Sequence, residues 1–326
     1  MRALYAVPLA LTIVLSGCTS GGTNGAPVAP IAPALVPNSG QVPIAFVIPN
    51  RTVQSTSAAR SPRYVSPGTA SVALYDGATL VFVGNYNQTA NPQFTTVYAV
   101  SGTTSIVSGA CVAGGSSSTC TVTVQTSIGS HTFGAVMYPN SQSSSGVGTP
   151  PSSFSGVILA EGQITVNVVA GTNPTQTIVP LGVANLTVFT PPTLTQRLNG
   201  NGPLVGIIGT TYTFQYAIFD SALLQIIQPG NYDNAPVAIA ETDGGAIVTM
   251  TPISQSSPPP STGTQSFTVV CANNGTATIT ASAQTRPTTT YASGLTYTSS
   301  NYPTATIGTT TLQCVPNSAT FPVGVQ

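Results

Sequence analysis

Few side chains in this sequence could take part in catalysis. His131 is the single histidine among 326 residues and could act as a general base. It lies in a short alternating segment, which favours a surface position on a β-strand. Glu161 could pair with a second carboxylate for glycoside hydrolysis, but no other acid has a recognisable setting. The sequence has no Gly-x-Ser-x-Gly elbow, no His-Glu-x-x-His pair and no phosphate-binding loop ending in lysine. We therefore expect no catalytic residue, no cofactor and no enzyme.

The cysteines offer covalent chemistry instead. Four of them follow Cys18, and four cysteines allow three pairings in an oxidising compartment. We expect Cys111–Cys120 and Cys271–Cys314, because each pair then stays inside one of the two domains proposed below. A metal site would need four converging thiolates or imidazoles. With one histidine and no Cys-x-x-Cys, no metal site is expected.

Several acids could bind calcium. Glu241 and Asp243 are two residues apart, so an extended chain places them on one side, and Asp233 could join them. Calcium normally takes about six to eight oxygen ligands, which three scattered acids do not supply. Solvated loop acids are the better explanation for these three, and for Asp220 in an expected turn.

Two groups of side chains could contact a ligand. Three arginines near the start of the first domain could meet a polyanionic polymer, although solvated side chains along a sandwich are the simpler explanation; they are Arg51, Arg60 and Arg63. With 12 tyrosines and no tryptophan, tyrosine is the candidate residue for stacking on sugars. The best candidates share a loop-like stretch, although core or edge positions are the simpler expectation; they are Tyr291, Tyr297 and Tyr302.

Composition points to an all-β chain. Charged residues make up 4% of the sequence, and six arginines balance six acids with no lysine at all. No basic face exists that could bind nucleic acid. The 32 glycines and 28 prolines, with many β-branched residues, indicate short strands joined by frequent turns.

The first domain is expected at residues 44–185. Asp76-Gly77 between two alternating segments is a type I′ hairpin signal. About seven strands at this spacing suggest a β-sandwich. The expected strands are residues 71–75, 79–86, 94–100, 121–124, 131–138, 157–168 and 176–181.

The second domain is expected at residues 186–326. Its alternating segments are separated by a proline-rich loop at residues 255–264. Asn273-Asn274-Gly275 is a turn signal that predicts a hairpin between the two segments around it. The expected strands are residues 211–219, 224–227, 247–253, 266–272, 276–282 and 304–314.

The N-terminal residues resemble the signal of a bacterial lipoprotein. Met1-Arg2 and an apolar run to Leu15 precede Ser16-Gly17-Cys18, which matches a lipobox. The resemblance implies cleavage after residue 17 and fatty acylation of Cys18, so the membrane is a partner through this anchor. Residues 18–43 carry Gly-Gly and five prolines, and we expect an extended tether without secondary structure. An outer-membrane location is expected, at the outer surface or the periplasmic face, because Thr19 is not aspartate.

Further motifs resemble exported bacterial lipoproteins with Ig-like or carboxypeptidase-regulatory-like β-sandwich domains. Tyr138-Pro139 departs from them, since relatives carry Tyr-Asp there, and this puts acid-dependent contacts at that turn in doubt. The resemblance implies two Ig-like sandwiches and hardly any known activity. The matching segments are residues 60–67, 119–124, 129–133, 159–171, 230–237, 267–271 and 275–279.

Together these features predict a cell-envelope lipoprotein with a structural or binding role, as an adhesive or scaffold. A carbohydrate-binding surface module is the alternative, and an envelope glycan hydrolase is a further one. A glycan or protein at the cell surface would be the partner. A pocket that combined His131 with an acid would favour the enzyme.

Overall fold

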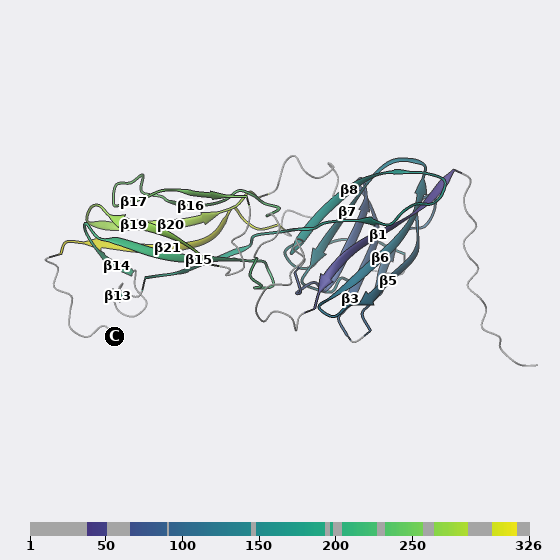
Figure 1. Cartoon of the computed structure of the whole chain (residues 1–326), viewed down its shortest axis with the longest axis horizontal. Helices are drawn as coiled ribbons and strands as arrows, with labels where there is room; N and C mark the ends of the chain where they lie inside the picture. The colour runs from purple at the N-terminus through teal and green to yellow at the C-terminus, as the bar shows by residue number, and fades with distance from the viewer. Residues whose placement is uncertain are drawn as a thin grey trace, which may run out of the picture. The chain divides into compact units, whose positions relative to one another are not determined.

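The computed structural model describes residues 38–50, 66–89, 91–144, 148–192, 196–197, 204–226, 232–256, 264–285 and 302–317. All helix or strand elements in these ranges are β-strands and none is a helix, which confirms the all-β prediction. The described strands all belong to one compact unit, Leu35–Gln326, and form two sandwiches (Figure 1).

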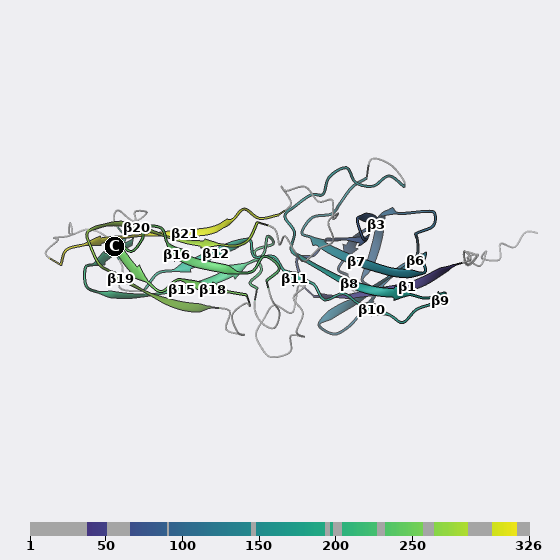
Figure 2. The ribbon, with the colours of Figure 1, turned by 90° about the horizontal axis from the view of Figure 1, so that it is seen from above.

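The first sandwich pairs two sheets around one core. Sheet A has the order β10 (Gln176–Thr177), β1 (Ser39–Pro49), β6 (Ser117–Ser127) and β5 (Ser105–Ala113), and β9 (Gly171–Thr172) also pairs with β1. Sheet B has the order β11 (Leu181–Gly182), β8 (Ala160–Val168), β7 (Gly129–Tyr138), β2 (Ser71–Asp76), β3 (Thr79–Asn87) and β4 (Gln93–Ala99). Figure 2 shows β9 and β10 beside β1, to which both are parallel.

Alternation explains why these segments form a sandwich. Along β1, the side chains of Val42, Ile44, Phe46 and Ile48 are fully buried. Successive side chains of a strand point to opposite faces, so these four residues share the inner face of sheet A. Strand β6, antiparallel to β1, contributes further buried residues to the same cluster, namely Cys120, Val122 and Val124.

The second sandwich has the strand arrangement of an immunoglobulin domain. Sheet C has the order β12 (Leu186–Thr190), β15 (Thr211–Phe219), β19 (Gln265–Cys271) and β17 (Val248–Met250), which corresponds to strands A, B, E and D. Sheet D has the order β13 (Gln196–Arg197), β14 (Leu204–Ile207), β21 (Thr306–Val315), β20 (Gly275–Ser282), β16 (Val237–Glu241) and β18 (Ile253–Gln255). In it β21, β20 and β16 occupy the G, F and C positions.

The tether ends earlier than predicted, because β1 begins at Ser39 and contains Pro43. Proline has no N–H and is excluded from most central strands. In β1, the carbonyls of Gln41 and Ala45 accept hydrogen bonds from Asn173 and Ile178. The backbone of Pro43 therefore faces the same edge of β1 as Gln41 and Ala45. It lies between the end of β9 and the start of β10, and neither of these short strands pairs with it.

The hairpin after β2 also differs from the prediction. Asp76 pairs with Thr79, so the two turn residues are Gly77 and Ala78 rather than Asp76 and Gly77. Gly77 has φ of 55°, whereas Ala78 is not among the described residues with positive φ. One positive φ at the first turn position is the pattern of a type II′ turn. Asp76 is thus the last residue of the strand.

Other predicted segments are divided between sheets. The expected hairpin around Asn273-Asn274-Gly275 is wrong, because β19 joins sheet C and β20 joins sheet D. Residues 247–253 likewise yield β17 and β18 in different sheets, and residues 176–181 yield β10 and β11. The two sheets of a sandwich bury the same kinds of side chain, so the alternation of a strand does not tell to which sheet it belongs. Residues 224–226 form no strand beyond an isolated bridge of Gln225 to Phe219.

Candidate functional site

The ends of three strands bring a serine, a histidine and an aspartate together in the first sandwich. Asp76 ends β2, and His131 lies near the start of the neighbouring β7. Ser127 is the last residue of β6. Only Ile128 separates β6 from β7, and Gly129 adopts φ of 128°, so the chain reverses within a very short turn. Ser127 and His131 therefore face each other although they belong to different sheets.

The side chains form a continuous hydrogen-bonded series. His131 Nδ1 lies 2.9 Å and 2.8 Å from the two carboxylate oxygens of Asp76. On the other side of the ring, His131 Nε2 lies 3.3 Å from Ser127 Oγ. The Thr126 hydroxyl donates to Asp76 Oδ2 at 3.1 Å and fixes the carboxylate. We call Ser127, His131 and Asp76 the Ser-His-Asp cluster.

The carboxylate selects the tautomer of the imidazole. An ionised carboxylate only accepts hydrogen bonds, so in the neutral ring the proton resides on Nδ1 of His131. Nε2 then presents its lone pair to the Ser127 hydroxyl. A serine, a histidine and an aspartate joined in this order can move a proton from the hydroxyl to the ring.

The predicted surface position of His131 needs correction. Its side chain is 15% exposed and that of Asp76 is 12% exposed. The ring stacks on Phe133 with a centroid distance of 6.0 Å. Sequence reasoning missed the contact between His131 and Asp76, because Asp76 was assigned to a turn and lies 55 residues away along the chain.

Glu161 does not pair with another acid for glycoside hydrolysis. It lies in β8 and is fully buried, so its carboxyl group cannot meet a solvent-borne sugar. Burial, and next the nearby Glu161 charge, raise the pKa of Tyr75 well above its usual value, while a hydrogen bond with Tyr138 opposes the shift. The acid and these two tyrosines therefore form part of the interior, and this removes the observation that motivated a glycan hydrolase.

The acids considered for calcium accept hydrogen bonds from other groups of the protein. Asp233 accepts a 2.5 Å hydrogen bond from the Tyr302 hydroxyl, whereas Glu241 accepts one from the Asp243 main-chain N–H at 2.7 Å. Asp220 is buried rather than solvated, and its Oδ1 accepts from the N–H groups of Ala222 and Leu224. Within the described ranges, no three metal-ligating side chains are grouped closely enough to hold an ion.

Asp243→Asn is expected to lower stability at neutral pH but not in acid. Slight burial would raise the pKa of Asp243, but a hydrogen bond with Glu241 and main-chain N–H groups of Val248, Ile247 and Gly245 lower it below 3.8. A carboxylate with a depressed folded-state pKa stabilises above the unfolded value, and this contribution is lost as pH falls through the folded pKa.

Melting temperatures of wild type and Asp243→Asn, measured between about pH 7 and about pH 2, should therefore converge in acid. Thr242→Ala is the matched control, because its side chain makes one exposed hydrogen bond to Thr278 and carries no charge. A difference between wild type and Asp243→Asn that stays constant over this range would contradict the prediction.

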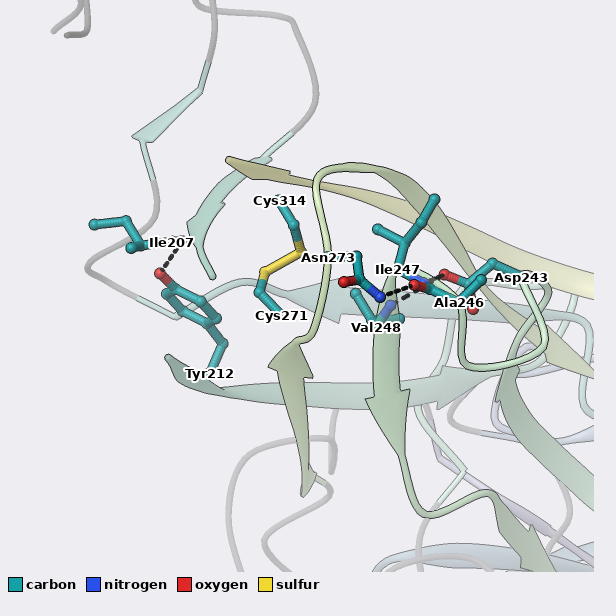
Figure 3. Close-up of a disulfide and its surroundings, with 9 residues drawn as sticks. All are labelled: Ile207, Tyr212, Asp243, Ala246, Ile247, Val248, Cys271, Asn273 and Cys314. Atoms are coloured by element: carbon teal, nitrogen blue, oxygen red, sulfur yellow. Dashed lines mark hydrogen bonds between the residues drawn. A yellow bond between two sulfur atoms is a disulfide. The ribbon is translucent and has the colours of Figure 1, made fainter. Parts of the chain in front are cut away.

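Both predicted disulfides are present. Cys111 and Cys120 are direct cross-strand partners in β5 and β6, with a Cα–Cα distance of 4.0 Å. Cys271 and Cys314 connect β19 with β21, and therefore join sheet C to sheet D across the core (Figure 3). Both of the latter are fully buried. A Cβ on Gly206 would lie 2.8 Å from Cys271 Sγ, so the glycine allows β14 to approach this bridge.

The remaining predicted residues are placed less favourably for ligand binding. Tyr302 is 6% exposed and belongs to a buried cluster with Tyr75 and Tyr138, which corrects its assignment as a ligand contact. Tyr291 and Tyr297 lie outside the described residues, as do Arg51, Arg60 and Arg63. Cys18 and the predicted signal also lie outside them. No helix in the described part of the chain is long and apolar enough to cross a membrane.

No family model matches the chain, and no curated protein matches it. Domains 5–6 of the S-layer protein SbsC are 14% identical, with a TM-score of 0.21 over 76% of this chain and 97% of that chain. The D00-D0 domain of intimin is 13% identical, with a TM-score of 0.20 over 67% of this chain and 94% of that chain. Domains 4–9 of SbsC are 14% identical, with a TM-score of 0.21 over 75% and 31%. Similarities this low carry no argument about function.

Proposed function

We propose that this chain is a lipid-anchored protein of the bacterial cell envelope with a structural or binding role, and that it is not a metabolic enzyme. The observation that carries the proposal is the pair of disulfides, which persist in oxidising compartments such as the cell envelope. Buried hydrogen bonds also join residues of the two sandwiches. Asn234 Oδ1 accepts from Ala184 N at 2.9 Å, and Asn234 Nδ2 donates to Ala184 O at 2.8 Å. Next to this pair, Asp233 N donates to Gly182 O at 2.9 Å.

Further contacts strengthen the connection. The Ser221 hydroxyl, which follows β15, donates to the Val157 carbonyl before β8 at 2.7 Å. Tyr302, which precedes β21, is packed in one buried cluster with Tyr75 and Tyr138 of the first sandwich. These contacts are additional to the hydrogen bonds of Asp233 and Asn234.

The chemistry of the rest of the chain supports an envelope location. Disulfides persist in oxidising compartments, and this chain forms two of them. The match of residues 15–18 to a lipobox supplies the anchor.

Replacing the anchor residue tests the proposal. Cys18→Ser is expected to abolish incorporation of a radiolabelled fatty acid and to move the protein from the membrane fraction to the soluble fraction. The thioether of a lipoprotein forms on the sulfur of this one cysteine, so the loss should be complete rather than partial. Ser20→Ala, two residues away, is the matched control and should retain both label and membrane association. Equal incorporation by wild type and Cys18→Ser would overturn the anchor.

A further inference from the structure

We infer that Ser127 is a nucleophile activated by His131 and Asp76, and that it accepts an acyl group from activated carboxylic esters. This inference is independent of the lipid anchor and of the role proposed above. It rests on the order of the three side chains: Ser127 Oγ is 3.3 Å from His131 Nε2, and His131 Nδ1 is 2.8 Å from Asp76. A weak nucleophile next to an oriented base is the arrangement that makes serine reactive.

The backbone holds the three residues in place. Gly77 N donates to Thr132 O at 2.8 Å, which ties the β2–β3 turn to β7. Ile128 N donates to Asn38 O at 3.1 Å, which ties the β6–β7 turn to the residue before β1. Both partners of the imidazole are therefore strand residues directly before an anchored turn, and the protein itself orients the ring.

Exposure distinguishes Ser127 from the neighbouring hydroxyl. Ser127 is exposed, so an ester in solution can reach its oxygen. Thr126 is 1% exposed, and its hydroxyl lies 3.5 Å from Nδ1 of His131 rather than near Nε2. Thr126 also donates to Asp76, so it is a positioning residue for the carboxylate. Of these two hydroxyl groups, only that of Ser127 is both exposed to solvent and within hydrogen-bond distance of His131 Nε2.

The step balances without an oxidant or reductant. The Ser127 Oγ–H proton passes to His131 Nε2 while Oγ forms a bond to the carbonyl carbon of the ester. The bond from that carbon to the leaving alcohol or phenol breaks, and the leaving oxygen takes the proton back from Nε2. The products are an ester on Ser127 and a free alcohol or phenol. The Asp76 carboxylate stays ionised and stabilises the imidazolium formed on the way.

The experiment uses the full chain with p-nitrophenyl acetate as the probe. Intact-mass measurement and peptide mapping should show one acetyl group, located on Ser127. Ser127→Ala should lose this modification, and His131→Gln should slow it on the order of 100-fold, the usual contribution of a general base. Ser130→Ala is the matched control, because Ser130 is also exposed, lies one residue from His131 and should leave the rate unchanged.

The pH profile separates an activating role from a structural one. With wild type, the acetylation rate should rise with pH and then level off, because the proton acceptor is a ring nitrogen of the protein rather than hydroxide. The rate of an unassisted serine would instead keep rising with pH, because the serine reacts as its alkoxide, a small fraction that grows continuously with pH. Such a continuous rise, acetylation spread over other serines, or an unchanged rate in a folded His131→Gln variant would each overturn the inference. If His131→Gln fails to fold, the wild-type profile still decides it.

Discussion

Replacing Cys271 and Cys314 together with alanine is expected to lower the melting temperature of the full chain by about 8–16 °C. This disulfide joins cysteines 43 residues apart, and removing its restraint on the unfolded chain lowers stability by about 4 kcal/mol in the chain-entropy model. In a chain of this size, a loss of about 1 kcal/mol lowers the melting temperature by roughly 2–4 °C. Loss of the two sulfur atoms also leaves space between sheets C and D, where both residues are fully buried. Alanine avoids burying two hydroxyl groups.

Cys111→Ala/Cys120→Ala is the matched control for this prediction. Its sequence separation is 9, for which the same model gives about 2.7 kcal/mol, and it joins two strands that already pair directly. Cys111 is only partly buried, so less packing is lost. The melting shift should therefore be smaller. A larger shift from this variant than from the Cys271 and Cys314 variant would show that the hairpin of β5 and β6 limits the stability of the chain.

Hydrogen exchange locates the effect. In the Cys271 and Cys314 variant, protection should fall in β19 and β21, because the missing bridge joins these two strands. Protection in β1 and β6 should change little, since they belong to the core of the first sandwich. Uniform loss of protection over both sandwiches would contradict a local role of the bridge.

Local patterns in the sequence were sufficient to find most strands. The hairpin of β2 and β3 and the whole of β15 follow from alternation and turn residues, both of which are local. The disulfide pairing also follows, because two cysteines within one domain are far more easily joined than two in different domains. Local patterns do not tell which sheet a strand joins. For example, β19 and β20 are separated by three residues yet belong to opposite sheets.

The candidate site was less predictable, because it depends on register between distant strands. Asp76 reaches His131 only because β2 pairs with β7 such that Asp76 is opposite Phe133. Shifting that register by one residue would place His131 on the other face. Tyr302 was misjudged for a related reason: its hydrogen-bond partner Asp233 is 69 residues away along the chain, and the cluster that buries Tyr302 includes Tyr75 and Tyr138 of the first sandwich.

Asn234→Ala is expected to destabilise the chain by about 2–6 kcal/mol, since each of two buried main-chain groups left unpaired costs about 1–3 kcal/mol. Asn234 is fully buried, and its side-chain amide pairs with both the N–H and the carbonyl of Ala184, as a neighbouring strand would. The methyl group of alanine neither donates nor accepts hydrogen bonds, so the N–H and the carbonyl of Ala184 both lose their partner.

Asn140→Ala is the control for Asn234→Ala, because the Asn140 amide is exposed and donates one hydrogen bond to Ser155 at 3.2 Å. Water can replace that bond, so its loss should cost less than about 0.5 kcal/mol. Urea unfolding of both variants gives the comparison, and exchange of the Ala184 amide proton reports the broken bond directly. If Asn234→Ala unfolds at the same urea concentration as Asn140→Ala, the connection between the sandwiches does not depend on Asn234.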